Sequence, residues 1–156
     1  MKISLFVFGK TDISYIQQGI QEYEKRISFF CPFEVKTIVP SKNHGRLSPA
    51  QQLHDESILF TSKITPNDLV FLLDEKGKTY SSMAFAEHLE QWLSSGKKQL
   101  IFIVGGAYGF DASFKQKYPT LSLSPMTFNH QLARLVFVEQ LYRAFTIIKG
   151  LPYHNE

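Results

Sequence analysis

The residues best suited to chemistry in this chain follow three apolar runs. Residues 72–74 (LLD), 105–109 (GGAYG) and 124–129 (SPMTFN) each end or follow such a run. Glycine lets a backbone approach a ligand closely, and in an open parallel sheet ligands bind beside the carboxyl ends of the strands. We therefore expect these three segments to meet at one ligand site.

The glycine spacing argues against a phosphate loop as the basis of this site. Residues 105–109 do not match G-x-G-x-x-G, and no Lys-Ser or Lys-Thr pair follows them. On its own, the glycine pair at 105–106 could equally form a structural turn. The residues favour a nucleoside, held by backbone groups and apolar side chains.

A second group of reactive side chains lies at the C-terminus. Tyr153 and His154 come directly after Gly150 and Pro152, which end a helical pattern. Such a short terminal segment is often frayed. A tyrosine ring can nevertheless stack on a base, and an imidazole can accept or donate a proton, so the segment is a candidate for catalysis.

A long amphipathic helix is expected between these two groups. Apolar residues recur at helical spacing from residue 132 to residue 148, and Thr127 or Asn129 can cap the start. We expect the opposite, solvated face to carry His130 with Arg134, and Glu139 with Arg143, because residues four apart are neighbours on a helix. His130 could face the ligand site or only satisfy backbone groups at the helix start.

Five strands alternate with helices along the rest of the chain. The strands are expected at residues 2–9, 33–39, 68–74, 99–104 and 120–123. Most of these runs are apolar throughout, which is typical of strands buried on both faces, whereas 33–39 alternates and is expected nearer an edge. The pattern predicts one domain over residues 1–156, with an open, mainly parallel α/β sheet and helices on both faces.

Local signals suggest how several of these elements begin and end. We expect Asp12 or Ser14 to cap the first helix, and Asp111 to cap a short helix that ends at Lys117. Residues 75–78 (EKGK) are expected to turn the chain after the third strand. Residues 41–48 form a polar loop, whose Lys42, His44 and Arg46 are either an exposed basic patch or merely a solvated loop.

Composition excludes several classes of protein. The chain has 156 residues, of which 44% are hydrophobic and 20% are charged, as in ordinary globular proteins. A single cysteine, Cys31, excludes an internal disulfide, and the five histidines lack the spacing of metal ligands, so we expect no metal. We find no G-x-S-x-G motif, no signal peptide and no membrane-spanning stretch, and therefore expect a cytoplasmic protein. A net charge of +3 leaves RNA binding undecided.

Four segments resemble the RlmH family of small SPOUT-class methyltransferases that modify large-subunit ribosomal RNA. They are IVGGAYG, LSLSPMTFNHQLAR, VEQLYRAF and the terminal PYH, and the resemblance extends over essentially the whole chain. It implies an α/β fold with a C-terminal trefoil knot, and a homodimer with the cofactor site near the dimer interface. The implied reaction is methyl transfer from S-adenosylmethionine to N3 of a pseudouridine in helix 69 of 23S ribosomal RNA, on the assembled 70S ribosome.

The resemblance also implies which residues contact the cofactor. They are Leu73, Gly105, Ser124, Pro125, Met126, Thr127, Phe128 and Asn129. The family commonly has proline where this chain has Asn129, which can still cap a helix but does not constrain the loop in the same way.

The reaction requires loss of the N3 proton and stabilisation of charge on the flanking carbonyl groups. Our hypothesis is that Arg143 or Arg134 supports the base or a phosphate, while Tyr153 and His154 position the nucleoside. His154 is also the candidate proton acceptor, and Glu139 is expected to orient Arg143.

The basic residues of two surface segments are the candidates for phosphate contacts, which position a protein on RNA. They are Lys42, His44, Arg46, Lys97 and Lys98. Two other functions stay open: an RNA- or ribosome-binding protein of the same fold without enzymatic activity, and a methyltransferase that acts on transfer RNA.

Overall fold

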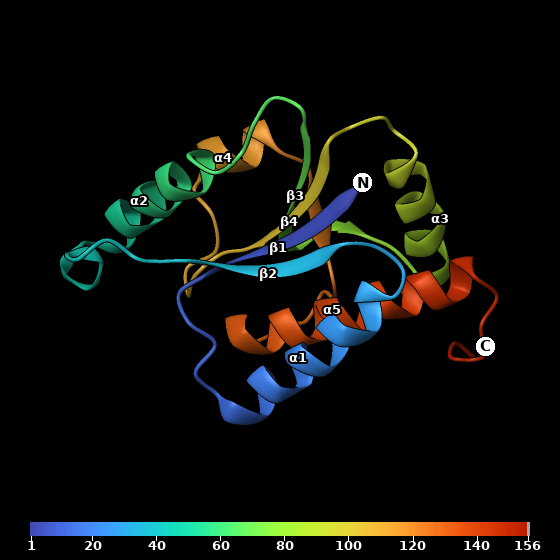
Figure 1. Cartoon of the computed structure of the whole chain (residues 1–156). Helices are drawn as coiled ribbons and strands as arrows, with labels where there is room; N and C mark the ends of the chain where they lie inside the picture. Colours follow the sequence, from blue (N-terminus) through green and yellow to red (C-terminus); the bar gives the residue numbers. More distant parts are fainter. Residues whose placement is uncertain (156) are drawn as a thin grey trace.

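Five parallel strands form one sheet in the computed structural model, which describes residues 1–155 (Figure 1). The strands are β1 (Lys2–Phe8), β2 (Phe33–Ile38), β3 (Asp68–Thr79), β4 (Gln99–Val104) and β5 (Thr120–Ser122). Their order is β2-β1-β4-β3-β5, and each neighbouring pair is parallel. The predicted parallel α/β sheet is confirmed, and the alternating strand β2 lies at an edge. The implied knot stays a prediction.

Helices cover both faces of this sheet, as expected (Figure 1). They are α1 (Ser14–Ser28), α2 (Pro49–Thr61), α3 (Ser82–Leu93), α4 (Ala112–Lys117) and α5 (His130–Ile148), with a short 3-10 helix η1 (His44–Arg46) before α2. One face carries α1, α3 and α5, and the other carries α2 and α4. Within residues 1–155, no helix is long and apolar enough to cross a membrane.

The burial of β1 explains its continuous apolar sequence. Ile3, Leu5 and Val7 point into the core under α1, α3 and α5, whereas Phe6 and Phe8 point into the core under α2 and α4. Successive side chains of a strand point to opposite faces, so a strand covered on both sides needs apolar residues at every position.

Helix α5 packs against α1, α3 and the sheet. Its N-cap is Asn129, whose side-chain oxygen accepts a hydrogen bond from the backbone N–H of Gln131 at 2.9 Å. This confirms one of the two predicted caps and shows that asparagine can begin the helix. The helix ends as predicted, since Gly150 adopts a left-handed backbone conformation with φ of +64°.

Helix α1 is capped by a residue from another helix. The expectation that Asp12 or Ser14 would cap it is wrong, because the N-cap position is Ile13, which has no capping side chain. Instead, the side-chain oxygen of Gln131 accepts from the backbone N–H groups of Asp12 (3.1 Å) and Ile13 (3.2 Å). The start of α1 is therefore bound to the start of α5.

Strand β3 continues through the segment expected to be a turn. It extends to Thr79, but its pairing with β5 shifts register between Leu73 and Lys78. Residues 74–77 fall between the two paired parts and bulge from the ladder. The prediction of a turn at 75–78 is wrong, because both ends of the segment pair with β5, which local sequence signals do not reveal.

Gly77 allows this bulge to lie against β5. A Cβ atom at position 77 would lie 2.7 Å from the backbone nitrogen of Leu121 and 2.7 Å from the carbonyl carbon of Thr120. These atoms belong to the backbone of β5, so they cannot move away from the added atom unless the strand itself moves. A side chain at this position is therefore excluded for steric reasons.

We predict that Gly77→Ala lowers the free energy of unfolding by about 2 kcal/mol or more, because the added methyl group must displace β5. Urea denaturation monitored by circular dichroism measures the change. Gly45→Ala is the matched control, since a Cβ atom there meets nothing within 4 Å; its effect should stay within about 0.5 kcal/mol. Equal effects of the two substitutions would contradict the prediction.

Candidate functional site

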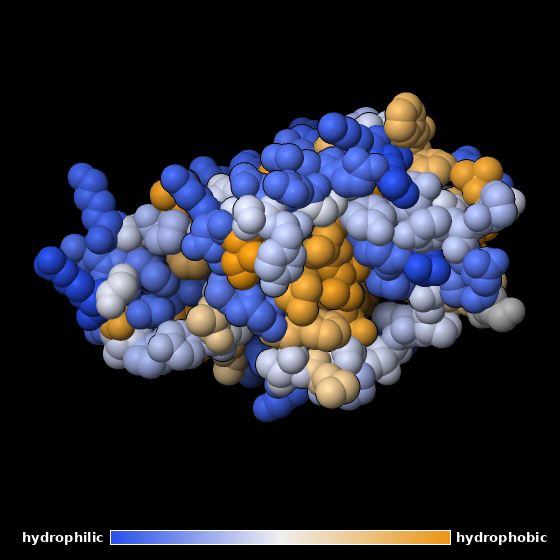
Figure 2. All heavy atoms as spheres, turned by 90° about the horizontal axis from the view of Figure 1, so that it is seen from below, coloured by the Kyte–Doolittle hydropathy of each residue, from blue (hydrophilic) through white to orange (hydrophobic). Residues whose placement is uncertain are grey.

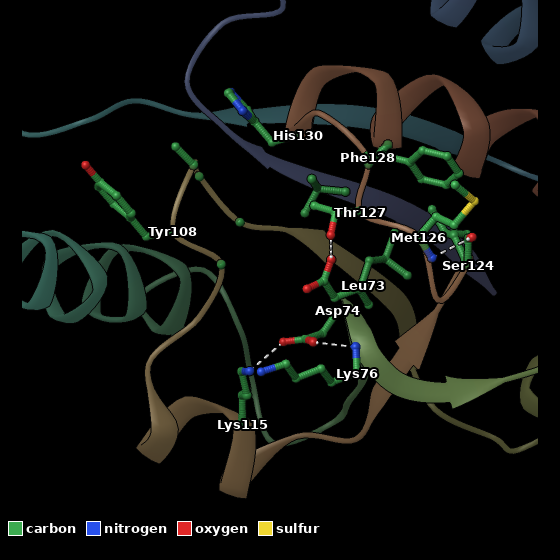
Figure 3. A pocket seen from close by; sticks show the side chains of 18 residues that line it. Leu73, Asp74, Lys76, Tyr108, Lys115, Ser124, Met126, Thr127, Phe128 and His130 are labelled. Carbon is green, nitrogen blue, oxygen red and sulfur yellow. Dashed lines mark hydrogen bonds and ion pairs between the residues drawn. The ribbon is translucent and has the colours of Figure 1, made fainter.

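A cavity of about 330 Å³ lies beside the bulge of β3 and the carboxyl ends of β4 and β5 (Figure 3). Its walls comprise residues 73–76 at the bulge of β3, residues 104–109 at the end of β4, and residues from the loop between β5 and α5. Small-molecule sites commonly have volumes of about 300–1,000 Å³. The three strand ends expected to form a ligand site thus meet at one cavity.

Most of the residues proposed to contact the cofactor line this cavity. Those that do are Leu73, Gly105, Ser124, Met126, Thr127 and Phe128. Pro125 and Asn129 are not among the lining residues, and Asn129 instead caps α5. Several lining residues had no role in the sequence-based site, including Lys115, Leu123 and Ala133. Leu123 and Ala133 lie within the segment LSLSPMTFNHQLAR, whereas no local motif connects Lys115 to the site.

Backbone rather than side chains forms the wall at residues 105–109. A Cβ atom on Gly105 would lie 2.6 Å from the carbonyl oxygen of Gly109, and one on Gly106 would lie 2.7 Å from Oε1 of Glu56. Gly109 has a φ of +79°, which favours glycine. Glycine is therefore required at positions 105 and 106 by packing behind this wall, and at position 109 by the backbone conformation.

A charged group lies on the opposite wall. Asp74 Oδ2 is 2.7 Å from Nζ of Lys115, and Asp74 Oδ1 accepts a hydrogen bond from the backbone N–H of Lys76 at 2.8 Å (Figure 3). Burial tends to raise the pKa of Asp74, but these two bonds outweigh it and hold the pKa below its usual value. The cavity thus combines a fixed carboxylate with ammonium groups.

The loop after β5 forms the third wall, and it is held by one hydrogen bond within the loop and one to β3. The backbone N–H of Met126 donates to Ser124 Oγ at 3.0 Å, and the Thr127 hydroxyl bonds to the Glu75 carboxylate. The loop is thereby connected to the bulge of β3. The Met126 side chain is 76% exposed and so is open to a ligand.

His130 begins α5 and lines the cavity. Burial lowers the pKa of its imidazole, and the nearby Arg134 lowers it further. Its imidazole is therefore neutral at pH 7, so it can offer both a donor and an acceptor nitrogen to a ligand. Of the alternatives considered for His130, the structure favours a position at the ligand site.

The C-terminal segment folds onto α5 and forms a polar cluster, here called the tail cluster, of Glu139, Arg143, Tyr153 and His154. The predicted ion pair is confirmed, with Arg143 Nη2 2.5 Å from Glu139 Oε1. The Tyr153 hydroxyl donates to the same carboxylate oxygen at 3.0 Å, and the Arg143 guanidinium carbon lies 4.8 Å from the centre of the Tyr153 ring. Arg143 Nη1 contacts His154 Nδ1 at 3.3 Å.

The environment of the tail cluster determines which of its groups can accept a proton. Burial raises the pKa of Tyr153 well above its usual value, and its bonds to Tyr23 and Glu139 raise it further. Tyr153 therefore acts as a donor at neutral pH. A guanidinium can only donate, so His154 Nδ1 accepts from Arg143 and has its lone pair on that side.

The cavity and the tail cluster lie at different places along α5. The cavity contacts the helix at His130 and Ala133, whereas Glu139 and Arg143 hold the tail. At about 1.5 Å per residue, Ala133 and Arg143 are roughly 15 Å apart along the helix axis. A single chain therefore does not bring the proposed catalytic residues of the tail to the proposed cofactor site.

Arg134 is a buried structural residue of α5. The expectation that it lies on a solvated face and contacts the base or a phosphate is wrong, because its side chain is fully buried. Its guanidinium donates to the carbonyl oxygens of Phe8 (2.7 Å) and Gly9 (3.1 Å) and to the Thr11 hydroxyl (2.8 Å). Burial lowers its pKa to about 10, so it stays charged at pH 7.

His44 was expected to be an exposed contact to RNA, but its side chain is largely buried. Its Nδ1 lies 3.0 Å from Asp55 Oδ2, its Nε2 lies 3.4 Å from Glu56 Oε1, and its ring packs against Phe8. The acidic residues of α2 thus draw this side chain inward. The four lysine and arginine residues proposed with it are exposed: Lys42, Arg46, Lys97 and Lys98.

Neither a metal centre nor a reactive thiol is found among residues 1–155. No group of three or more His, Cys, Asp or Glu residues there could hold a metal ion. Burial raises the pKa of Cys31 to about 11, so the thiol stays protonated at pH 7 and is a poor nucleophile. The cavity and the tail cluster are therefore the places where we look for function.

Comparison with known proteins gives a consistent result over the full length. Residues 1–154 match the family described as "predicted SPOUT methyltransferase". Relatives named "Ribosomal RNA large subunit methyltransferase H" occur in Flavobacterium psychrophilum (49% identical), Parabacteroides distasonis (47%) and Porphyromonas gingivalis (41%). Each of these matches covers 100% of this chain and 100% of the relative.

We predict that Arg134→Met lowers the free energy of unfolding by about 3 kcal/mol or more, because two backbone carbonyls and a hydroxyl lose their charged donor in a buried site. Arg143→Met, the same change on the same helix, breaks a partly exposed ion pair and should cost about 1 kcal/mol or less. Urea denaturation compares the two. A similar loss for both variants would show that Arg134 has no special structural role.

We predict that Tyr153 resists ionisation at high pH. A phenol with an ordinary pKa ionises near pH 10, whereas burial and the carboxylate of Glu139 keep Tyr153 protonated. Absorbance at 295 nm, measured against pH for the wild type and Tyr153→Phe, tests this. The two curves should coincide up to about pH 11, and an extra tyrosinate step near pH 10 in the wild type would refute the assignment.

Proposed function

This chain belongs to the SPOUT methyltransferase family, and we propose that it transfers the methyl group of S-adenosylmethionine to N3 of a pseudouridine in helix 69 of 23S ribosomal RNA, on the assembled ribosome. The observation that supports this most directly is the cavity in which glycine backbone, apolar side chains and a few charged groups converge at three strand ends. The relatives named as large-subunit ribosomal RNA methyltransferases support the choice of substrate class.

The cavity suits the cofactor in shape and in charge. S-adenosylmethionine carries a methyl group activated by a positively charged sulfur, together with a nucleoside and a zwitterionic amino acid. Leu73, Phe128 and the bare backbone at Gly105 would hold the nucleoside, since they offer apolar contact and hydrogen-bonding groups. Asp74 and Lys115 supply opposite charges on the wall of the same cavity.

The tail cluster supplies the groups that the substrate requires. An imide N–H at N3 must lose its proton, and negative charge that develops on the neighbouring carbonyls needs donors. The Arg143 guanidinium can supply those donors, and the Tyr153 ring can support the base by stacking. His154 is the proposed proton acceptor, directly or through water, and Glu139 orients Arg143 and Tyr153.

A homodimer would unite the cavity with the tail cluster. Figure 2 shows apolar side chains gathered at the centre of the face seen from below, the side on which α1 and α5 lie. On α5, Leu132 and Val136 remain partly exposed and lie four residues apart. If a two-fold axis beside α5 brings the tail of one protomer to the cavity of its partner, it forms both such sites at once, because each contact in such an interface occurs twice.

The exposed basic residues would position the dimer on RNA. Lys42 and Arg46 lie beside α2, and Lys97 and Lys98 lie before β4. Contacts of this kind neutralise phosphates without reading the sequence. With a net charge of only +3, the chain has little to hold free RNA, which favours a target presented by the assembled ribosome.

The proposed function is tested with methyl-labelled S-adenosylmethionine and ribosomes that lack the modification. Isolated subunits and bulk transfer RNA are assayed in parallel, and mass spectrometry identifies the labelled nucleoside. Label at N3 of a pseudouridine in helix 69, only with assembled ribosomes, is the expected result. Label on transfer RNA would favour the alternative substrate, and failure to bind the cofactor would favour a non-enzymatic RNA-binding role.

We predict that His154→Ala lowers kcat on ribosomes about 100-fold, the usual contribution of a general base, while cofactor affinity changes little. Single-turnover assays and calorimetric titration of S-adenosylmethionine separate these two effects. His54→Ala is the control, since His54 is exposed on α2 and does not line the cavity. Undiminished turnover in His154→Ala would remove the tail from the chemistry.

A further inference from the structure

A buried carboxylate lies directly behind the glycine wall of the cavity. Glu56 is on α2 and is only 3% exposed, next to the core formed by residues such as Phe60 and Phe114. Burying a carboxylate is costly unless hydrogen bonds and opposite charges compensate for the lost water. The partners of Glu56 therefore indicate why an acidic residue occupies this position.

Glu56 has two polar partners on opposite sides. Its Oε2 accepts a hydrogen bond from the backbone N–H of Gly106 at 3.1 Å, and its Oε1 lies 3.4 Å from His44 Nε2. His44 is in turn held by Asp55 at 3.0 Å. Burial raises the pKa of Glu56, while the Gly106 N–H and the imidazole of His44 oppose that rise.

The bond to Gly106 acts on the whole glycine segment. The backbone N–H of Gly109 donates to the carbonyl oxygen of Gly106 at 3.2 Å, and these two residues form an isolated β-bridge. Residues 106–109 therefore form a closed turn that begins at Gly106 and ends at Gly109, and all four line the cavity. Because a Cβ atom on Gly106 would lie 2.7 Å from Glu56 Oε1, the carboxylate and the turn are in close contact.

From this arrangement we infer that Glu56 is a positioning residue for the cofactor: through the Gly106 amide it holds the 105–109 segment in the conformation that binds S-adenosylmethionine, without contacting the ligand itself. An apolar side chain could fill the same space between α2 and the sheet, as Phe60 does one turn later. Only an acceptor can hold the Gly106 N–H. The inference rests on the proposed function, since it takes the cavity as the cofactor site.

Three substitutions of Glu56 separate the acceptor from the bulk and the charge. Glu56→Ala removes the acceptor, Glu56→Asp keeps the charge but shortens its reach by one methylene group, and Glu56→Gln keeps both the reach and an acceptor oxygen. Glu24→Ala is the matched control, because Glu24 also accepts a hydrogen bond from a backbone N–H, that of Val35 at 3.0 Å, and lies on α1 away from the glycine segment. All variants are prepared as the full chain and checked for folding by circular dichroism.

Calorimetric titration with S-adenosylmethionine and amide hydrogen exchange at Gly106, measured without cofactor, test the inference. We expect about a tenfold or larger rise in Kd and at least tenfold faster Gly106 exchange for Glu56→Ala, the size of effect that loss of a buried acceptor produces. Glu56→Asp should lie in between, whereas Glu56→Gln should stay within about threefold of the wild type, as should Glu24→Ala. In ribosome assays the loss should appear in KM for the cofactor, with kcat nearly unchanged.

The outcomes distinguish positioning from a merely structural role. A structural role would lower the thermal midpoint of Glu56→Ala but leave Kd and Gly106 exchange at 25 °C unchanged, which would overturn the inference. Equal losses for Glu56→Gln and Glu56→Ala would overturn it as well. If Glu56→Ala fails to fold, Glu56→Asp decides by the same two measurements.

Failure of the proposed function would appear separately. A wild-type chain that does not bind S-adenosylmethionine would refute the cofactor assignment. Gly106 exchange would then still decide whether Glu56 holds the segment: faster exchange in Glu56→Ala or Glu56→Asp would support the positioning role, and unchanged exchange would overturn it.

Discussion

The contact between Arg134 and the end of β1 is the constraint on which the rest of the site depends. The Arg134 guanidinium joins the first half of α5 to the carbonyl groups of Phe8 and Gly9. Gln131 joins the same part of the helix to the start of α1. These bonds fix where α5 begins. The start of α5, with His130 and the loop before it, then forms one wall of the cavity.

Two carboxylates support the other walls in different ways. Asp74 lines the cavity at the bulge of β3, and Lys115 and a backbone N–H hold its pKa below the usual value. Glu56 lies behind the cavity, where burial raises its pKa and a glycine amide is its partner. The first can interact with a ligand, whereas the second can act only through the backbone that it holds. The same functional group thus has two roles, because Asp74 lines the cavity beside an ammonium group and Glu56 lies behind the cavity wall.

The length of α5 separates binding from the proposed chemistry within one chain. Its first turns contribute to the cavity and its later turns hold the tail cluster, in which Arg143, Tyr153 and His154 are organised around Glu139. A rigid helix cannot bend to bring these groups together. Association of two chains is the simplest physical way to place a tail beside a cavity, which is why the proposed function includes a homodimer.

Local patterns in the sequence determined much of this protein. Apolar runs predicted the five strands and the parallel sheet, because strands buried on both faces need apolar residues throughout. Apolar runs and the residues that end or follow them predicted the three segments that meet at the cavity, and helical spacing predicted the ion pair of Glu139 with Arg143. Each of these features depends on residues close together in the chain.

Only the tertiary structure decided the features that depend on distant residues. Arg134 is buried because α5 is covered where helical spacing suggested a solvated face, and residues 75–78 stay in β3 because β5 pairs with both ends of the bulge. Glu56 bonds to a glycine amide 50 residues later in the chain. Periodicity and capping signals describe only neighbouring residues, so they carry no information on which distant backbone group a buried side chain will meet.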